Sequence, residues 1–184
     1  MGWIILAIVV ILVIAIISMY NGLVSSRVKV DNAWSQIDVQ LQRRFDLIPN
    51  FVETVKGYMT HESETFEKIT ALRTSWANST TVEEKAKLDG ELSGALKTIM
   101  AVSENYPELK ANQNFSELSE ELRNTENKIS FSRQFYNDSV TMYNTKLELF
   151  PSNIVAGMFN FQKRDLFATE SEEARKNVKV DFNK

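Results

Sequence analysis

Several residues and motifs on which enzymes depend are missing from this chain. Its 184 residues include no cysteine and a single histidine. The chain therefore has no disulfide, no thiolate metal ligand and no cysteine nucleophile, and it cannot supply the two Glu-x-x-His pairs of a ferritin-like di-iron bundle. No glycine-rich phosphate loop or nucleophile elbow is recognisable. We expect a protein that is not an enzyme, and we assign no catalytic, cofactor-binding or metal-ligating residue.

Charge is absent from the start of the chain, where the first charged side chain is Arg27. The stretch from Trp3 to Tyr20 holds seven isoleucines, three valines and two leucines. As a helix it reaches about 27 Å, close to the thickness of a bilayer core, and an aromatic ring at each end suits the headgroup boundary. A cleaved signal peptide would begin with basic residues and end in small ones, and a lipoprotein would need a cysteine. We interpret residues 1–26 as an uncleaved transmembrane anchor that contacts the lipid bilayer through residues 3–24.

Basic residues indicate the direction of this anchor. Arg27 and Lys29 follow it closely, and Arg43 and Arg44 come later, whereas only the terminal amine precedes it. Because basic residues are enriched on the cytoplasmic side of membrane proteins, the pattern favours an N-terminus outside the cell and the remaining residues in the cytoplasm. We therefore expect a single-pass protein of the cell membrane in this orientation.

The part that follows the anchor carries the whole formal charge of −3 and contains no basic run. Nucleic-acid binding depends on neutralising phosphates with clustered lysine and arginine. We therefore expect no nucleic-acid partner.

The prolines divide the remaining chain into helices, since Pro49, Pro107 and Pro151 each follow a stretch of helical periodicity. The expected helices run from the anchor to about residue 48, over about 50–77, 83–105 and 115–149, with Asn114 as the last helix's N-cap, and briefly after Pro151. The first soluble helix shows an apolar stripe at Val30, Trp34, Ile37, Leu41 and Ile48. We expect an extended tail at 178–182. The predicted fold is all-α: an N-terminal transmembrane helix continuing into a long antiparallel bundle of about four main helices, with residues 27–184 as the soluble domain.

Two charged residues fall on the apolar seam of the second predicted helix, Glu62 and Arg73. A buried charge is costly unless it is paired, so we expect Arg73 to be partly buried against a carboxylate of another helix. The candidates are Glu104, Glu121 and Glu126. Such groups either fix the register of the helices or line a ligand or metal site. The same alternatives apply to His61, as a ligand beside Glu62 or as an exposed histidine.

Polar residues also interrupt the stripe of the fourth predicted helix, and these are Thr125, Ser132 and Tyr136, flanked by Glu126 and Arg133. An aromatic residue followed by asparagine recurs at Tyr20-Asn21, Tyr136-Asn137, Tyr143-Asn144 and Phe159-Asn160. Two interpretations fit this recurrence. The tyrosines form a binding surface, or they pack in the bundle with their hydroxyls at its edge.

Long segments of the chain match a known pattern. They are YNGLVSSRVKVDNAWSQIDVQLQRRFDLIPNFVETVKGY (20–58), AVSENYPELKANQNFSELSEELRNTENKIS (101–130), SRQFYNDSVTMYN (132–144), FP (150–151) and VKVDF (178–182). In these segments the chain resembles the LemA family over nearly its whole length. The resemblance implies an N-terminal membrane segment, a long antiparallel helical bundle and residence in a bacterial membrane. It implies no enzymatic reaction, cofactor or catalytic residue.

Three functions remain open at this point. The first is a membrane-tethered scaffold or adaptor whose bundle binds other membrane or membrane-associated proteins. The second is a bundle that binds a metal or small ligand in a polar interior around Glu62 and Arg73. The third is a structural membrane protein that self-associates into a homo-oligomer through an exposed heptad seam.

Overall fold

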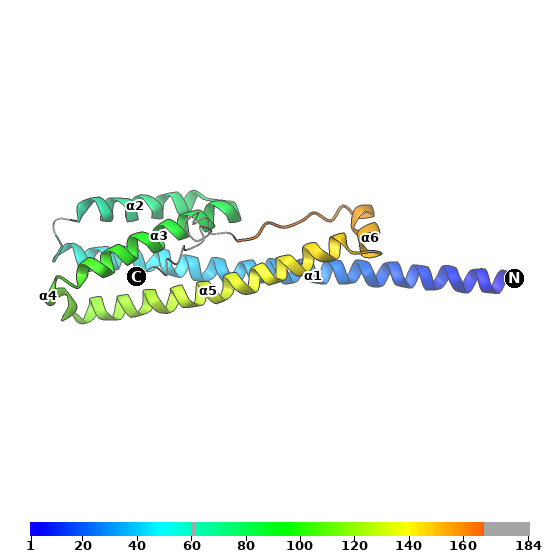
Figure 1. Ribbon diagram of the computed structural model, residues 1–184, viewed down its shortest axis with the longest axis horizontal. Coiled ribbons are helices and arrows are strands. Elements are labelled where there is room, and N and C mark those ends of the chain that lie inside the picture. The colour runs from blue at the N-terminus through cyan, green and yellow to red at the C-terminus, as the bar shows by residue number, and fades with distance from the viewer. Residues whose placement is uncertain (60–61, 168–184) are drawn as a thin grey trace, which may run out of the picture. The chain divides into compact units, whose positions relative to one another are not determined.

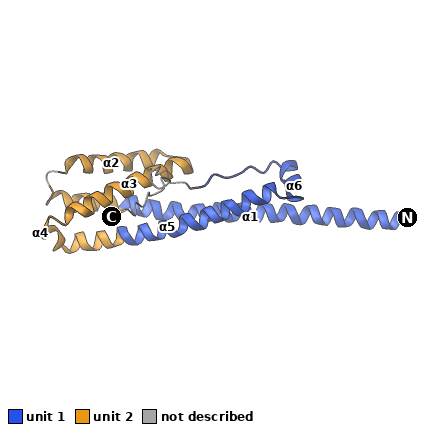
Figure 2. Cartoon of the chain, in the orientation of Figure 1, with its two compact units in different colours: residues 1–46, 122–166 blue, residues 47–121, 167–184 orange. Residues whose placement is uncertain are grey.

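A computed structural model describes residues 1–59 and 62–167 of the chain. Within these residues every element of regular secondary structure is a helix, which confirms the all-α prediction (Figure 1). The helices are α1 (Gly2–Lys56), α2 (Ser63–Asn78), α3 (Val82–Ser103), α4 (Pro107–Lys110), α5 (Gln113–Glu148) and α6 (Ser152–Met158). They divide into two compact units (Figure 2). Unit 1 comprises residues 1–46 and 122–166, and unit 2 comprises residues 47–121 together with the chain after 166.

The sequence predicts that the first helix ends before Pro49. In the structure this helix continues through Pro49 to Lys56. A proline inside a helix costs about 3 kcal/mol, because it removes one backbone hydrogen bond and crowds the preceding turn. Ile48 and Phe51 are buried on either side of Pro49. Burying a side chain of this size contributes about 1.5–3 kcal/mol, so two of them offset the proline. The predicted helix over 50–77 is therefore wrong at its start, and only α2 remains of it.

Unit 1 is built on an antiparallel pair formed by α1 and α5. Ser26 contacts Lys146, Trp34 contacts Tyr136 and Arg44 contacts Glu126, so the residue number falls along α5 as it rises along α1. Apolar residues of both helices form its core, among them Ala33, Ile37, Leu41, Phe45, Ile129, Tyr136 and Val140. The short helix expected after Pro151 is present as α6, and it packs on α1 near Leu23.

Unit 2 contains the hairpin of α2 and α3, the short α4, and the adjoining ends of α1 and α5. The loop before α3 is closed by a capping box, in which the Thr81 hydroxyl accepts from the Glu84 N–H and the Glu84 carboxylate accepts from the Thr81 N–H. At the start of α5 the cap is Asn112 rather than the predicted Asn114, because its Oδ1 accepts from the Phe115 N–H at 3.0 Å. The expected extended tail at 178–182 lies outside the described residues.

Candidate functional site

The two charged residues singled out on the second predicted helix do not form a common site. Arg73 is exposed, so the prediction that it is buried against a carboxylate is wrong. Its neighbour Leu72 occupies the core position instead. Glu62 is half-buried and accepts a hydrogen bond from the Tyr106 hydroxyl at 3.2 Å within unit 2.

In unit 1, Arg44 is the arginine that is buried where α1 packs against α5. Its Nη2 lies 2.7 Å from Oε2 of Glu126, and the two side chains are 3% and 34% exposed. Burial lowers the pKa of the Arg44 guanidinium, while the Glu126 carboxylate acts in the opposite direction. From the sequence, Glu126 flanks the polar residues of the fourth predicted helix and is a candidate partner of Arg73, whereas Arg44 is only a charge that orients the anchor. Its spacing of three from Leu41 and four from Ile48, both apolar, was the signal that could have identified it.

A second arginine stands near this pair. Burial, together with the positive charge of Arg44, lowers the pKa of Arg133 to about 10. Thr125, one residue before Glu126, is buried as well. The arrangement places two guanidinium groups and one carboxylate between α1 and α5, among the side chains that hold the two helices together. Sliding either helix would separate the Arg44 and Glu126 charges, so the arrangement favours the register in which they meet.

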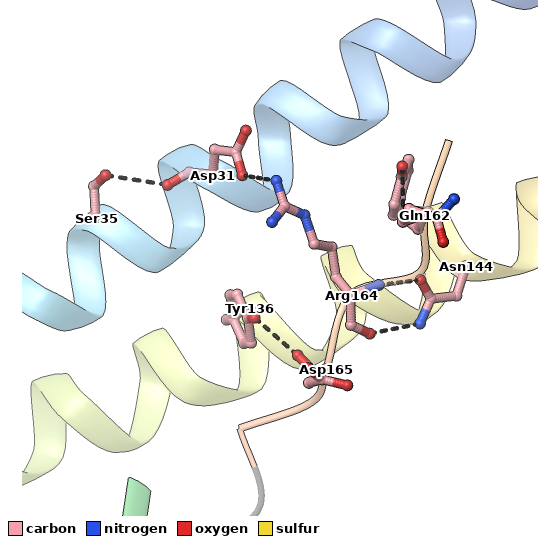
Figure 3. A network of polar contacts seen from close by, with 8 residues as sticks. Asp31, Ser35, Tyr136, Asn144, Gln162, Arg164 and Asp165 are labelled. Atoms are coloured by element: carbon pink, nitrogen blue, oxygen red, sulfur yellow. Dashed lines mark hydrogen bonds and ion pairs between the residues drawn. The ribbon is translucent and has the colours of Figure 1, made fainter. Parts of the chain in front are cut away.

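A segment after α6 lies along the α1 and α5 pair, and its residues 159–166 are called the strap here. Two tyrosine hydroxyls of α5 donate to strap carbonyls, Tyr136 to Asp165 at 2.8 Å and Tyr143 to Gln162 at 3.0 Å. The Asn144 amide exchanges two hydrogen bonds with the backbone of Arg164, at 2.8 and 3.0 Å. Figure 3 shows the contacts of Tyr136 with Asp165 and of Asn144 with Arg164.

The strap also reaches α1. The Arg164 guanidinium pairs with the Asp31 carboxylate at 3.0 Å (Figure 3). The Arg27 guanidinium lies 5.3 Å from the centre of the Phe161 ring. Tyr20 contacts the ring of Phe159, with the ring centres 4.7 Å apart. Tyr136 and Tyr143 are therefore buried in unit 1 with their hydroxyls bonded to the strap, as the second of the two interpretations expects, whereas Tyr20 is 36% exposed and contacts the strap from the surface.

One side of the α1 and α5 pair presents apolar side chains to the surface. Val39 is 63% exposed, Phe131 is 76% exposed, and Phe135 follows one turn later at 53%. A shallow groove of about 490 Å³ runs between the two helices here, and it is lined by Ser35, Gln36, Val39, Gln40, Lys128, Phe131 and Ser132. This apolar groove of unit 1 combines large exposed side chains with neutral polar groups and one lysine. Such a lining suits another helix or peptide better than a small charged ligand.

A family sequence pattern matches residues 33–182, which is most of the chain. The chain belongs to the LemA family. It is 30% identical over 168 residues to Protein LemA of Metamycoplasma hominis, in a match that covers 89% of this chain and 73% of that protein. It is 23% identical over 174 residues to each of two proteins of Paramagnetospirillum magneticum, Magnetosome protein MamQ 1 and Magnetosome protein MamQ 2. Those matches cover 80% of this chain and 64% of each MamQ protein, so the chain spans less than two thirds of their length.

In this LemA family chain, α1 is long and apolar enough to cross a membrane, judged by length and composition over the described residues. None of its most apolar 18-residue window is buried. An apolar helix that packs against nothing is typical of a segment whose surroundings are lipid. The anchor expected from the sequence is thus present as a helix, and it agrees with a membrane-associated protein.

The described residues of this LemA family chain do not bring together the ligands that the metal-site alternative requires. Across residues 1–59 and 62–167, no group of three or more histidine, cysteine or acidic side chains is placed to hold a metal ion. His61 lies outside the described residues. In unit 2 a surface groove is bordered by Lys56, Phe66 and Glu67 among others, and its lining includes neither Glu62 nor Arg73.

Proposed function

We propose that this LemA family chain is a membrane-anchored scaffold or adaptor that binds another membrane-associated protein. The anchor crosses the cell membrane once through residues 3–24, with its N-terminus outside and the two helical units in the cytoplasm. In support, α1 is uncharged up to Arg27, and Arg27 and Lys29 follow the apolar stretch directly. Among the relatives, two are named as magnetosome proteins, and neither name denotes an enzymatic activity.

The observation that carries this proposal is the apolar groove of unit 1. Side chains as large as phenylalanine are normally buried, and Phe131 and Phe135 stand exposed one helical turn apart. The Arg44–Glu126 pair joins the two helices beneath them, which favours a surface that is formed before a partner binds. We expect the partner to be an amphipathic helix that inserts apolar residues spaced three and four apart between α1 and α5. Lys128 at the rim favours an acidic residue on that helix.

Photo-cross-linking in native membranes tests the proposal. A photoreactive amino acid replaces Phe131 in the full chain, and the cross-linked products are identified by mass spectrometry. The matched control carries the same group at Ser130, an exposed position about 100° around α5 from Phe131. A defined membrane-associated protein captured from position 131 and absent at 130 is the expected result. Equal labelling at the two positions, or none at either, would contradict a docking role for the groove.

Self-association is the second candidate, and the same groove supports it. Two copies that pair through this surface would bury the exposed phenylalanines of both chains in an isologous interface. In the experiment above, this function predicts that the product cross-linked from position 131 is twice the mass of the chain. Peptide mapping would then locate both ends of the cross-link on α1 or α5.

A further inference from the structure

A second uncharged stretch follows α5. Between Glu148 and Lys163, residues 149–162 contain no charged side chain. Five of their apolar residues are exposed, and together they are called the α6 patch: Leu149, Phe150, Ile154, Met158 and Phe159. Phe150, at the turn before α6, is 79% exposed, and Met158 at the end of α6 is 68% exposed. Apolar surface gathered in this way on a short segment marks an interaction site rather than ordinary surface scatter.

The position of α6 is set by its other face. Val155 and Ala156 are buried in a small core with Leu23, against which Met19 also packs. The Tyr20 ring contacts the strap on the same side, so α6 sits beside α1 where the anchor's apolar stretch ends (Figure 1). Ile154 and Met158, four residues apart, share the face of α6 that does not pack on α1. The α6 patch therefore lies at the depth of the headgroup boundary of any bilayer that residues 3–24 span.

The charge around the patch differs from that of the chain as a whole. Over residues 20–31 and 142–166, five basic side chains accompany three acidic ones. They are Arg27, Lys29, Lys146, Lys163 and Arg164, against Asp31, Glu148 and Asp165. The complete chain has a formal charge of −3, so this region is net positive in a chain that is net negative. A cationic rim around exposed apolar side chains is the composition of segments that lie in the interface of anionic membranes.

We propose that the α6 patch is a second membrane contact, which inserts Phe150, Ile154 and Met158 into the headgroup layer of the leaflet where the anchor ends. The proposal rests on the anchor of the proposed function, and the bilayer is the partner because the patch is continuous with that anchor through Met19, Tyr20 and Leu23. Two contacts at one leaflet hold a helical hairpin at a fixed tilt, whereas one helix allows rotation. The α6 patch therefore sets which side of unit 1 faces the membrane.

Fluorescence quenching in vesicles tests this contact, and the absence of cysteine makes single-site labelling simple. The full chain is reconstituted into vesicles of phosphatidylcholine with phosphatidylglycerol, and an environment-sensitive fluorophore is attached in turn to Phe150→Cys, Ile154→Cys, Leu12→Cys and Gln134→Cys. Leu12 lies within the anchor. Gln134 is an exposed control about 22 Å from the patch along α5. Each variant is measured with quenchers placed at shallow and deep positions of the lipid chains, and with aqueous iodide.

The expected result is a blue shift at positions 150 and 154, with loss of emission on shallow lipid quenchers and little loss on iodide. The label at 12 should lose emission on deep lipid quenchers, and the label at 134 on iodide alone. If 150 and 154 behave like 134 while 12 remains quenched by deep lipids, the α6 patch faces water and this inference is overturned, with the anchor intact. If 12 is also quenched by iodide, the anchor itself fails and the second contact fails with it. Repeating the measurement without phosphatidylglycerol should weaken shallow quenching at 150 and 154 only.

Discussion

Unit 1 and unit 2 are both helical and each buries a charged side chain, but they place their arginines differently. In unit 1 a guanidinium and a carboxylate, Arg44 and Glu126, lie among the apolar residues that join α1 and α5. In unit 2 the hairpin of α2 and α3 packs mainly through apolar side chains such as Ile69 and Leu92, and Arg73 stays at the surface. Asp89 of α3 is the buried charged residue on that hairpin.

This difference matters because the two kinds of packing respond differently to substitution. Apolar seams tolerate exchange between side chains of similar volume. A buried ion pair does not tolerate loss of one partner, since the other charge is then stranded in a poorly solvated place. Unit 1 is also the unit that carries the anchor, the strap and the apolar groove. The charged contact therefore specifies register in the part of the chain where a fixed surface is needed.

Replacing the buried arginine should have the largest effect. Arg44→Met removes the guanidinium that lies 2.7 Å from the Glu126 carboxylate, and we expect the free energy of unfolding to fall by about 3 kcal/mol. That is the lower end of the range for buried pairs, because the Glu126 side chain is 34% exposed and retains some solvation. Urea unfolding of the full chain in detergent, followed by tryptophan fluorescence, provides the measurement. The double variant with Glu126→Leu should recover much of the loss, and a midpoint unchanged by Arg44→Met would show that the pair does not stabilise unit 1.

A smaller effect is expected where the strap is held. Tyr143→Phe removes the hydroxyl that donates to the Gln162 carbonyl, and this should cost about 0.5–1.5 kcal/mol in the same unfolding experiment. In unit 2, Tyr106→Phe removes the donor to the half-buried Glu62 and is the matched control. Hydrogen exchange at the strap amides should rise in the first variant and stay unchanged in the second. Equal exchange in both variants would mean that the tyrosine does not hold the strap.

The same tyrosines give a pH dependence whose sign can be worked out. Burial raises the pKa of both Tyr136 and Tyr143, because it disfavours the phenolate. The unfolded tyrosines ionise near pH 10 and the folded ones at higher pH, so the native state loses stability as the pH rises above about 10. Arg133, with its pKa lowered to about 10, acts in the opposite direction, since the folded state releases that proton first. The free energy of unfolding is measured against pH for the unchanged chain and for the Tyr136→Phe, Tyr143→Phe double variant. The arginine contribution cancels in the difference between the two, and this difference should shrink above pH 10. A constant difference between pH 8 and 11 would contradict buried hydroxyls.

The sequence predicts much of this fold because its helices are long and strongly periodic. The helices expected over 83–105 and 115–149 are found at Val82–Ser103 and Gln113–Glu148, and polar residues mark the loop between α2 and α3. The first helix shows the limit of local rules. Pro49 suggests a boundary, but the buried residues on either side of it continue the helix, and that gain depends on tertiary packing.

The candidate site was harder to predict. Along the first helix, Arg44 and Phe45 are both buried between Leu41 and Ile48. A charged residue spaced three and four positions from apolar residues of a stripe is the signal that it is buried with them. The strap contacts had no comparable signal, because Tyr136 and Tyr143 bond to backbone carbonyls 29 and 19 residues away. Every residue has such a carbonyl, so only the folded path of the chain selects these.

The smallest expected effect concerns Arg73, the residue that the heptad repeat placed in the core. Arg73→Met should change the free energy of unfolding by less than about 0.5 kcal/mol, because the side chain is exposed and its replacement strands no buried charge. The adjacent Leu72, which is 6% exposed, is the matched control, and Leu72→Ala should cost about 2–5 kcal/mol. Urea unfolding of the full chain with both variants and Arg44→Met side by side compares the two units directly. A loss of stability for Arg73→Met close to that for Arg44→Met would place a buried ion pair in each unit. It would mean that Arg73, rather than Leu72, is the residue of α2 that faces the core.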